Sequence, residues 1–172
     1  ATYIANVYFT GDEDEVISGT GTNDFNILTV DKGNSRNTIL DITANNLNLS
    51  YTGGTSLILS NGTFRVSNTN LVFILSTTSS FTIPITAALS VNEGEVTIGT
   101  TSDAGDLILA GRLEVINNGI VNIGTGGNYD NDIEYASGGN PEIIVSGGSL
   151  TVNGQIRRPI LISTGSLSYT QG

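Results

Sequence analysis

Three acidic residues at alternate positions form the most regular group in this sequence that could do chemistry. Asp130, Asp132 and Glu134 stand at positions i, i+2 and i+4, so on a β-strand their carboxylates share one side. Ca²⁺ is a hard cation that prefers oxygen ligands, although this spacing lacks the glycine and closing glutamate of an EF-hand loop. The row predicts a calcium site, and the alternative is the solvent-facing side of an amphipathic strand.

A second acidic group lies near the N-terminus. Asp12 and Asp14 stand in a run with Glu13 and Glu15, and Asp24 follows. Adjacent like charges repel one another, and a bound cation relieves that repulsion. Asp12, Asp14 and Asp24 are therefore a second candidate calcium site, with a solvated acidic loop as the alternative. We expect no cofactor other than calcium.

Groups that could cleave a polysaccharide are sparse. The chain has no His and no Cys, which removes the usual general base and any thiolate site. Glycoside hydrolases need paired carboxylates, and lyases need a basic group near acidic ones. The close pairs in the sequence are Glu93 with Glu95, Asp103 with Asp106, and Arg112 with Glu114. Such residues are ordinary at turns and in surface ion pairs, so we predict no catalytic residue.

Composition and charge narrow the partners. The 172 residues carry 16 acidic and 6 basic side chains and a net charge of -10, which disfavours a phosphate backbone, so we expect no nucleic acid partner. The longest apolar run, 71–75, is far below the roughly 20 residues of a membrane-spanning helix, so we expect no membrane insertion. An acidic chain with no thiol and no leader at its start favours a secreted or cell-surface location.

Two stretches are near copies of each other and indicate how these groups are positioned. The stretches are LSVNEGEVTIG, from Leu89 to Gly99, and LEVINNGIVNIG, from Leu113 to Gly124. Each is an alternating apolar run, a turn at Gly94 or Gly119, and a second alternating run. A unit of this kind cannot bury its apolar side alone and must stack on copies of itself, which predicts a β-solenoid.

A related phrase sets the length of one turn of that solenoid, called a rung below. It begins at Ser56 (SLILSNGTFRV), at Ser149 (SLTVNGQIRRP) and at Ser166 (SLSYTQG). The spacings of the repeats predict irregular rungs of about 17–25 residues. The fold class predicted is all-β, a right-handed parallel β-helix. Asn-Gly pairs also favour hairpins, so an antiparallel sandwich is the main alternative.

The organisation along the chain follows from where the repeats occur. Residues 1–33 are more acidic and less repetitive, and we predict that they form an N-terminal cap, since an open sheet edge needs protection. Residues 34–172 are predicted to form the rungs. The last copy, at Ser166, stops partway through the phrase, so we expect the solenoid to be cut short at its C-terminal end.

The chain resembles a known family in its repeats. The stretches that carry the likeness are NILTVDKGNSRNTILDIT, SLILSNGTFRV and SLTVNGQIRRPILISTGSLSYTQG. They are similar to the parallel β-helix regions, with a pectin-lyase-like fold, of large secreted surface proteins and adhesins exported by the type IX secretion system. The resemblance implies a right-handed parallel β-helix, a secreted or cell-surface place, and contact with secretion machinery.

Two functions are compatible with these expectations. The first is a structural or adhesive segment of a large secreted bacterial surface protein, non-catalytic, with a surface polysaccharide or another cell-surface protein as its partner. The second is a polysaccharide-active lyase or hydrolase domain. It requires Asp or Glu and Arg clustered on consecutive rungs of one face.

Overall fold

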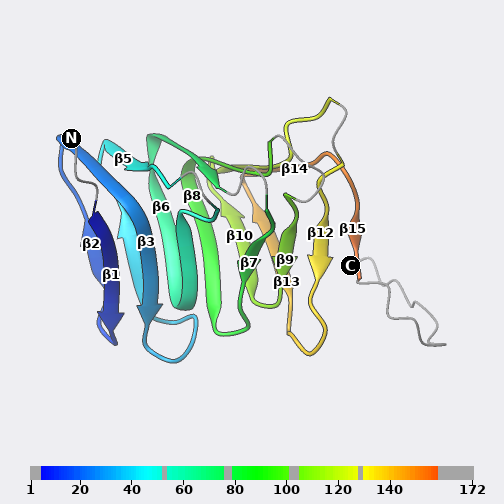
Figure 1. Ribbon diagram of the computed structural model, residues 1–172, viewed down its shortest axis with the longest axis horizontal. Helices are drawn as coiled ribbons and strands as arrows, with labels where there is room; N and C mark the ends of the chain where they lie inside the picture. Colours follow the sequence, from blue (N-terminus) through cyan, green and yellow to red (C-terminus); the bar gives the residue numbers. More distant parts are fainter. Residues whose placement is uncertain (1–4, 52–53, 76–78, 101–104, 128–129, 159–172) are drawn as a thin grey trace.

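The structure is a computed structural model that describes residues 5–51, 54–75, 79–100, 105–127 and 130–158. The chain is all-β in these residues, and its strands stack as a parallel β-solenoid of about six turns (Figure 1). Every strand-to-strand ladder in the described part is parallel, and the one antiparallel contact is an isolated bridge between Ile116 and Gly147. The predicted solenoid is confirmed, and the antiparallel sandwich is wrong.

The described residues contain fifteen strands, most of them short because glycine, asparagine and serine end each apolar run. They are β1 (Ala5–Gly11), β2 (Glu15–Ile17), β3 (Thr22–Lys32), β4 (Ile39–Ile42), β5 (Asn46–Leu49), β6 (Leu57–Leu75), β7 (Phe81–Ile83), β8 (Ala87–Ile98), β9 (Leu107–Leu109), β10 (Arg112–Ile116), β11 (Ile120–Ile123), β12 (Ile133–Tyr135), β13 (Glu142–Ser146), β14 (Ser149–Val152) and β15 (Ile156–Arg157). No helix of the described part is long and apolar enough to cross a bilayer.

The strands build three faces, and the longer strands bend from one face to the next. The first face contains 22–25, β5, 71–75, 95–98, β11 and β14. The second face contains β1, 28–32, 57–61, β7, β9, β12 and β15. The third face contains β2, β4, 62–66, 87–91, β10 and β13. Counting levels along the stack gives rungs 1 to 7, of which rungs 1 and 7 are incomplete.

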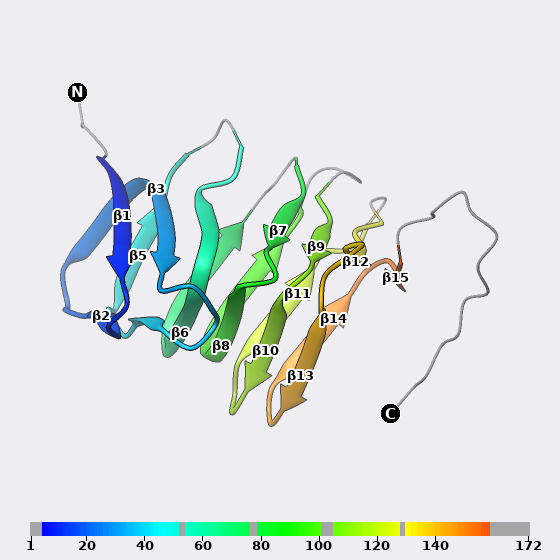
Figure 2. The ribbon, with the colours of Figure 1, turned by 90° about the horizontal axis from the view of Figure 1, so that it is seen from below.

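The two near copies lie on neighbouring rungs in the register that their letters predict. Leu89 pairs with Leu113, and Val96 pairs with Val121. Steps between paired residues run from 20, Ala5 to Phe25, to 30, Arg112 to Glu142. The ladder is therefore irregular as expected, and its longest turns exceed the predicted 25 residues because loops leave the stack at the corners (Figure 2).

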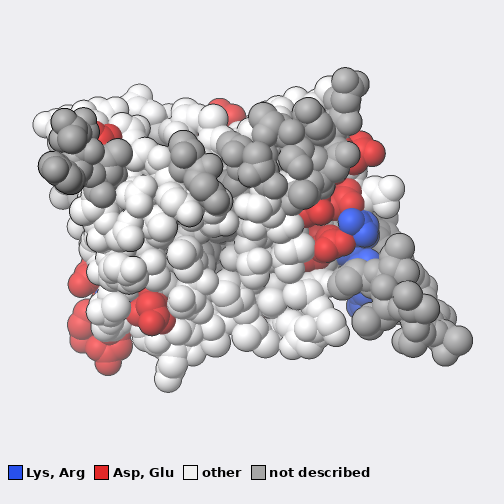
Figure 3. Space-filling model, in the orientation of Figure 1, with Lys and Arg blue, Asp and Glu red and all other residues white. Residues whose placement is uncertain are grey.

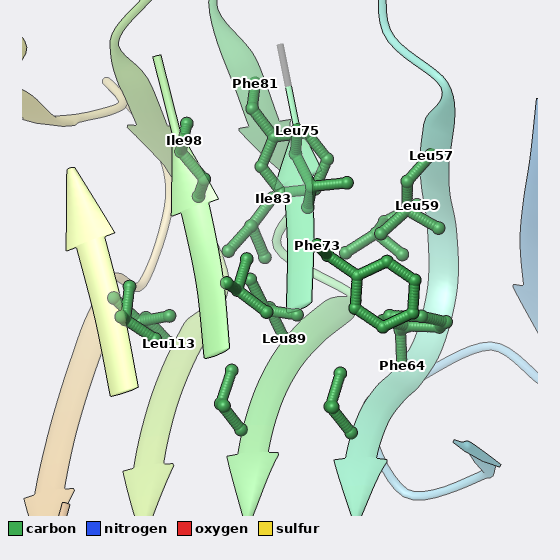
Figure 4. Close-up of a cluster of buried hydrophobic side chains, with 14 of the residues drawn as sticks. Leu57, Leu59, Phe64, Phe73, Leu75, Phe81, Ile83, Leu89, Ile98 and Leu113 are labelled. Atoms are coloured by element: carbon green, nitrogen blue, oxygen red, sulfur yellow. The ribbon is translucent and has the colours of Figure 1, made fainter. Parts of the chain in front are cut away.

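The core is a column of aliphatic side chains that point inward from all three faces (Figure 4). Alternation places one side of each strand inside, and Leu89, Leu107 and Ile133 are completely buried. Phe64 and Phe73 meet edge to face, with ring centroids 5.9 Å apart. The column supplies most of the stability, at roughly 1.5–3 kcal/mol for each fully buried aliphatic or aromatic side chain.

Gly94 and Gly119 stand at bends, as predicted, for different reasons. Gly94 has a φ of +79°, a left-handed conformation that glycine adopts without strain. Gly119 is required by close approach, because a Cβ atom there would lie 2.0 Å from the carbonyl oxygen of Val91. The two glycines therefore fix the corner between the third and first faces.

Asparagine side chains join successive rungs, which explains the high asparagine content. Asn48 Nδ2 donates to Asp24 Oδ1 at 2.7 Å, and Asn68 Nδ2 donates to the carbonyl oxygens of Thr43 and Ala44 at 3.0 and 3.2 Å. The partners are 23 to 30 residues apart in most of these bonds. These asparagine side chains therefore link neighbouring rungs by hydrogen bonds along the axis of the stack.

The ends of the predicted segments are only partly described. Residues 5–32 supply β1 to β3, which pair in parallel with the strands that follow, and a capping role for residues 1–33 stays a prediction. The repeat at Ser166 lies outside the described residues.

Candidate functional site

The row Asp130, Asp132 and Glu134 lies at the C-terminal end of the described stack, against Arg157. Glu134 Oε1 is 2.8 Å from Arg157 Nη2, and Arg157 Nε donates to Asp132 Oδ2. The other oxygen of Asp132 accepts the Gln155 amide at 2.6 Å. The hydrogen bond to Asp132, ahead of the charge of Glu134, raises the pKa of Arg157. Figure 3 shows acidic and basic side chains next to one another at its right-hand end.

The guanidinium takes the place that a cation would need at this row. Asp130 is exposed and lines a hollow of about 400 Å³ together with Asp132, Asn153 and Arg157. Within the described ranges, no three His, Cys, Asp or Glu side chains lie close enough to hold a metal ion. Calcium at this row stays a prediction, and it requires the cation to displace Arg157 from Asp132 and Glu134.

The N-terminal acidic residues lie in different places. Asp12 and Asp14 are in the turn between β1 and β2, and Asp14 Oδ1 accepts the Ile39 amide at 2.8 Å. Asp24 is on the first face and accepts from Asn48. Each of Asp14 and Asp24 therefore holds a neighbouring rung, and the structure does not bring Asp24 together with the other two.

Described members of the close pairs considered for catalysis bond to residues outside their pairs. Glu95 accepts from Asn122 at 2.9 Å, and Asp106 accepts the Asp132 amide at 2.8 Å. Arg112 bonds to Glu142, while its strand neighbour Glu114 accepts from Ser90. Asp103 lies outside the described residues.

A charged row on the outer side of the third face was missed by sequence reasoning. Asp41, Arg65, Ser90 and Glu114 occupy the same register on four consecutive rungs. Arg65 Nη2 is 2.6 Å from Asp41 Oδ2, and Ser90 Oγ donates to Glu114 Oε2 at 2.7 Å. The hydrogen bond to Asp41 raises the pKa of Arg65. These residues are 24 or 25 positions apart in the sequence. An alignment of the rungs with one another therefore places them in one row.

A second charged group extends along the same face. Glu142 Oε2 lies 2.8 Å from both Arg112 Nε and Arg36 Nη1. The hydrogen bond from Arg112, and the charges of both arginines, hold the pKa of Glu142 below its usual range. Arg36 stands in the loop before β4 on rung 2, whereas Glu142 begins β13 on rung 6. The sequence holds no signal for this contact, because its partners are 106 residues apart.

The floor of the third-face row is recessed. Ser90 is 1% exposed and Asp41 is 9% exposed. Asp41 Oδ1 and Arg65 Nε are buried and have no hydrogen-bond partner among the described residues. A hydroxyl group both donates and accepts, so a hydroxyl or a water molecule suits these two atoms.

Comparison with known proteins returns no matching family model, no matching curated protein and no matching solved structure.

Proposed function

We propose that this chain is a structural and adhesive β-solenoid segment of a large secreted bacterial surface protein, non-catalytic, which presents its faces and loops to a surface polysaccharide or another cell-surface protein. The pectin-lyase-like form of the β-helix and export by the type IX system are part of the same proposal. They rest on the resemblance of the repeats. The solenoid itself is the part of this proposal that the fold supports directly.

One observation carries the proposal: the charged side chains are used to join rungs. Five of the six basic residues take part in ion pairs, and each pair joins two different rungs. A catalytic acid or base needs a group that can reach a substrate and change its proton. Carboxylates held by arginine on a neighbouring rung stabilise the stack instead.

The outer side of the second face offers a surface without charge along its middle. Thr29, Ile58, Thr82 and Ile108 face outward there on rungs 2 to 5. In Figure 3 the charged side chains of that view lie mostly towards the two ends of the stack. A neutral surface of this kind suits contact with a neutral polysaccharide or with another protein, because little charge has to be desolvated.

The test compares binding with turnover on the same samples. The purified chain is passed over immobilised acidic and neutral polysaccharides, and the retained fraction and any new reducing or unsaturated ends are measured. We expect retention without new ends, and weaker retention for Ile58→Asp than for the matched control Val72→Asp on the first face. Production of new ends overturns the non-catalytic proposal.

A polysaccharide-active domain is the second candidate, and the third-face row favours it. Asp41, Arg65 and Glu114 are clustered on one face, which is the arrangement that such an enzyme requires. If this candidate holds, Asp41→Asn and Glu114→Gln abolish turnover while each variant keeps the circular dichroism spectrum of the folded chain. The exposed control Glu13→Gln leaves turnover unchanged. Absence of turnover by the unaltered chain on the whole panel removes this candidate.

A further inference from the structure

The stack is not paired equally at every level, and the difference is concentrated between rungs 3 and 4. On the first face, β5 pairs with β3 but not with 71–75 of β6. On the second face, 57–61 of β6 pairs with β3 but not with β7, whose ladder leads only to β9. Among the described strands, two of the three faces are thus interrupted at the same level, called the junction below.

The third face and both of its corners stay bonded at the junction. Residues 62–66 of β6 pair with 87–91 of β8. At one corner the Gly62 amide donates to the carbonyl of Thr86 at 3.1 Å, and Thr86 Oγ1 donates to the carbonyl of Ser60 at 3.1 Å. The connected strand β6 itself passes from rung 3 to rung 4 at the other corner. The third face therefore connects the two parts of the stack, while the other two faces are unpaired at the junction.

The second face has a crevice at the junction. A crevice of about 240 Å³ opens between 57–59 and β7, lined by the core residues Leu57, Leu59 and Phe81 and by the outward residues Ile58 and Thr82. No charged side chain is among its described lining residues. Neighbouring strands elsewhere in the stack pack at the spacing of a hydrogen-bonded ladder, about 4.8 Å, which leaves no such space.

Contacts on the outer side of the third face also connect the two parts of the stack. Arg36, which belongs to rung 2, bonds to Glu142 on rung 6, so this ion pair spans the junction along the third face. Arg65 and Ser90, on the two sides of the junction, are register partners in the same face. These contacts restrain the length of the third face, so relative motion is directed to the two unpaired faces.

We propose that the junction is a hinge, at which residues 5–66 and residues 71–157 swing about the third face and open or close the crevice between β6 and β7. Hinge motion about a few paired elements is an established type of domain movement. Opening exposes Leu57, Leu59 and Phe81, and it bends the axis of the solenoid without breaking any described ladder. The inference concerns motion only and does not rest on the proposed adhesive function.

The absence of cysteine from the chain allows the motion to be measured with two pairs of spin labels. Tyr8→Cys with Thr82→Cys spans rungs 1 to 4 across the junction, and Ile74→Cys with Thr151→Cys spans rungs 4 to 7 within one part. All four side chains are exposed and face outward. Because both pairs span three rung spacings, equal rigidity gives equal widths of the distance distribution. The hinge predicts a distribution about twofold wider for the first pair, and equal widths overturn it.

Hydrogen exchange on the unlabelled chain gives an independent measurement. Amides of 57–59 and of β7 should exchange about tenfold faster than those of β9 and β10, since they lie at the opening edges. A disulfide between Ile58→Cys and Thr82→Cys should slow exchange at 57–59 and leave β10 unchanged. If β7 exchanges as slowly as β9 before cross-linking, or if the disulfide changes both regions equally, the hinge is wrong.

Discussion

The two parts of the stack on either side of the junction, residues 5–66 and residues 71–157, hold their rungs together by different means. In the N-terminal part, β3 runs without interruption from the first face to the second, and a buried lysine and two asparagine–aspartate bonds join neighbouring rungs. In the C-terminal part the second face is made of strands of two or three residues, with loops and glycines at the corners. The two parts therefore build their second faces from strands of different length, and the interruption of the ladders lies where the parts meet.

The difference teaches that apolar stacking specifies the solenoid while polar side chains specify its local shape. Inward positions are mostly leucine, isoleucine, valine or phenylalanine in both parts. The hydrogen bonds and ion pairs between rungs instead depend on which polar residues the register places opposite each other. The following experiments sharpen or break this comparison, in order of decreasing effect.

Replacing Phe64 by alanine should have the largest effect. Phe64 is fully buried on rung 3 and contacts Phe73 on rung 4, so its ring joins the two parts across the junction. Loss of a buried phenylalanine costs about 3–5 kcal/mol. Because the contact joins the parts, we also expect unfolding in denaturant to separate into two steps.

Leu113→Ala is the matched control for Phe64→Ala. It should cost about 2–5 kcal/mol and leave a single transition, because Leu113 lies wholly within the C-terminal part. Two-step unfolding of Leu113→Ala, or a single transition for Phe64→Ala by both circular dichroism and fluorescence, contradicts the division of the stack.

The buried ion pair of the N-terminal part should respond unequally to loss of its two members. Lys32 is completely buried, and its ammonium donates to the carbonyl of Thr10 at 3.0 Å and to Glu15 at 2.9 Å. Glu15→Gln removes the carboxylate and leaves a buried charge, which costs about 1.5–3 kcal/mol. Lys32→Met leaves only Glu15, whose side chain is 43% exposed and can be hydrated.

We therefore expect Glu15→Gln to destabilise the chain more than Lys32→Met, as measured by the free energy of unfolding in urea. Glu13→Gln, two positions before Glu15, serves as the control and should be neutral. The reverse order of the two variants shows that the packing of the lysine stem, rather than its charge, holds rung 1 to rung 2.

Substitutions at Gly119 and Gly21 test the effect of close packing without a contribution from backbone strain. A Cβ at Gly119 would lie 2.0 Å from the Val91 carbonyl oxygen, whereas a Cβ at Gly21 would meet nothing within 4 Å, and neither residue has a positive φ. Gly119→Ala should therefore cost about 1–3 kcal/mol through overpacking. Gly21→Ala should be neutral or slightly stabilising. Equal melting temperatures for the two variants contradict the close approach of rungs at this corner.

How much of this could be predicted from the sequence depends on the range of each interaction. The alternation and the copies at Leu89 and Leu113 predicted the fold and the register, since both depend on patterns within one or two rungs. The interruption at the junction was not predictable, because the phrases at Ser56 and Ser149 are alike in sequence while only the first lies beside the junction. The same limit applies to the candidate sites, where strand alternation placed Asp132 and Glu134 together but not the partner Arg157.

The smallest effect expected is the pH dependence of the tie at Glu142, which joins both parts of the stack. Arg112 and Arg36 lower the pKa of this carboxyl in the folded chain below its usual value near 4.5. A depressed folded pKa contributes stability that is present above the unfolded pKa and is lost as the pH falls through the folded pKa. The melting temperature of the unaltered chain should therefore exceed that of Glu142→Gln at pH 7, and the difference should shrink to nothing below that folded value.

The two arginines allow the contribution across the junction to be separated from the one within the C-terminal part. Arg112 is the main cause of the lowered pKa of Glu142, ahead of Arg36, so Arg112→Ala should flatten the pH dependence more than Arg36→Ala. Since only Arg36 reaches across the junction, its loss should instead widen the distance distribution between labels at Tyr8→Cys and Thr82→Cys, while Arg112→Ala leaves that width unchanged. A change of width with Arg112→Ala and not with Arg36→Ala contradicts the assignment of Arg36 as the restraint on the third face.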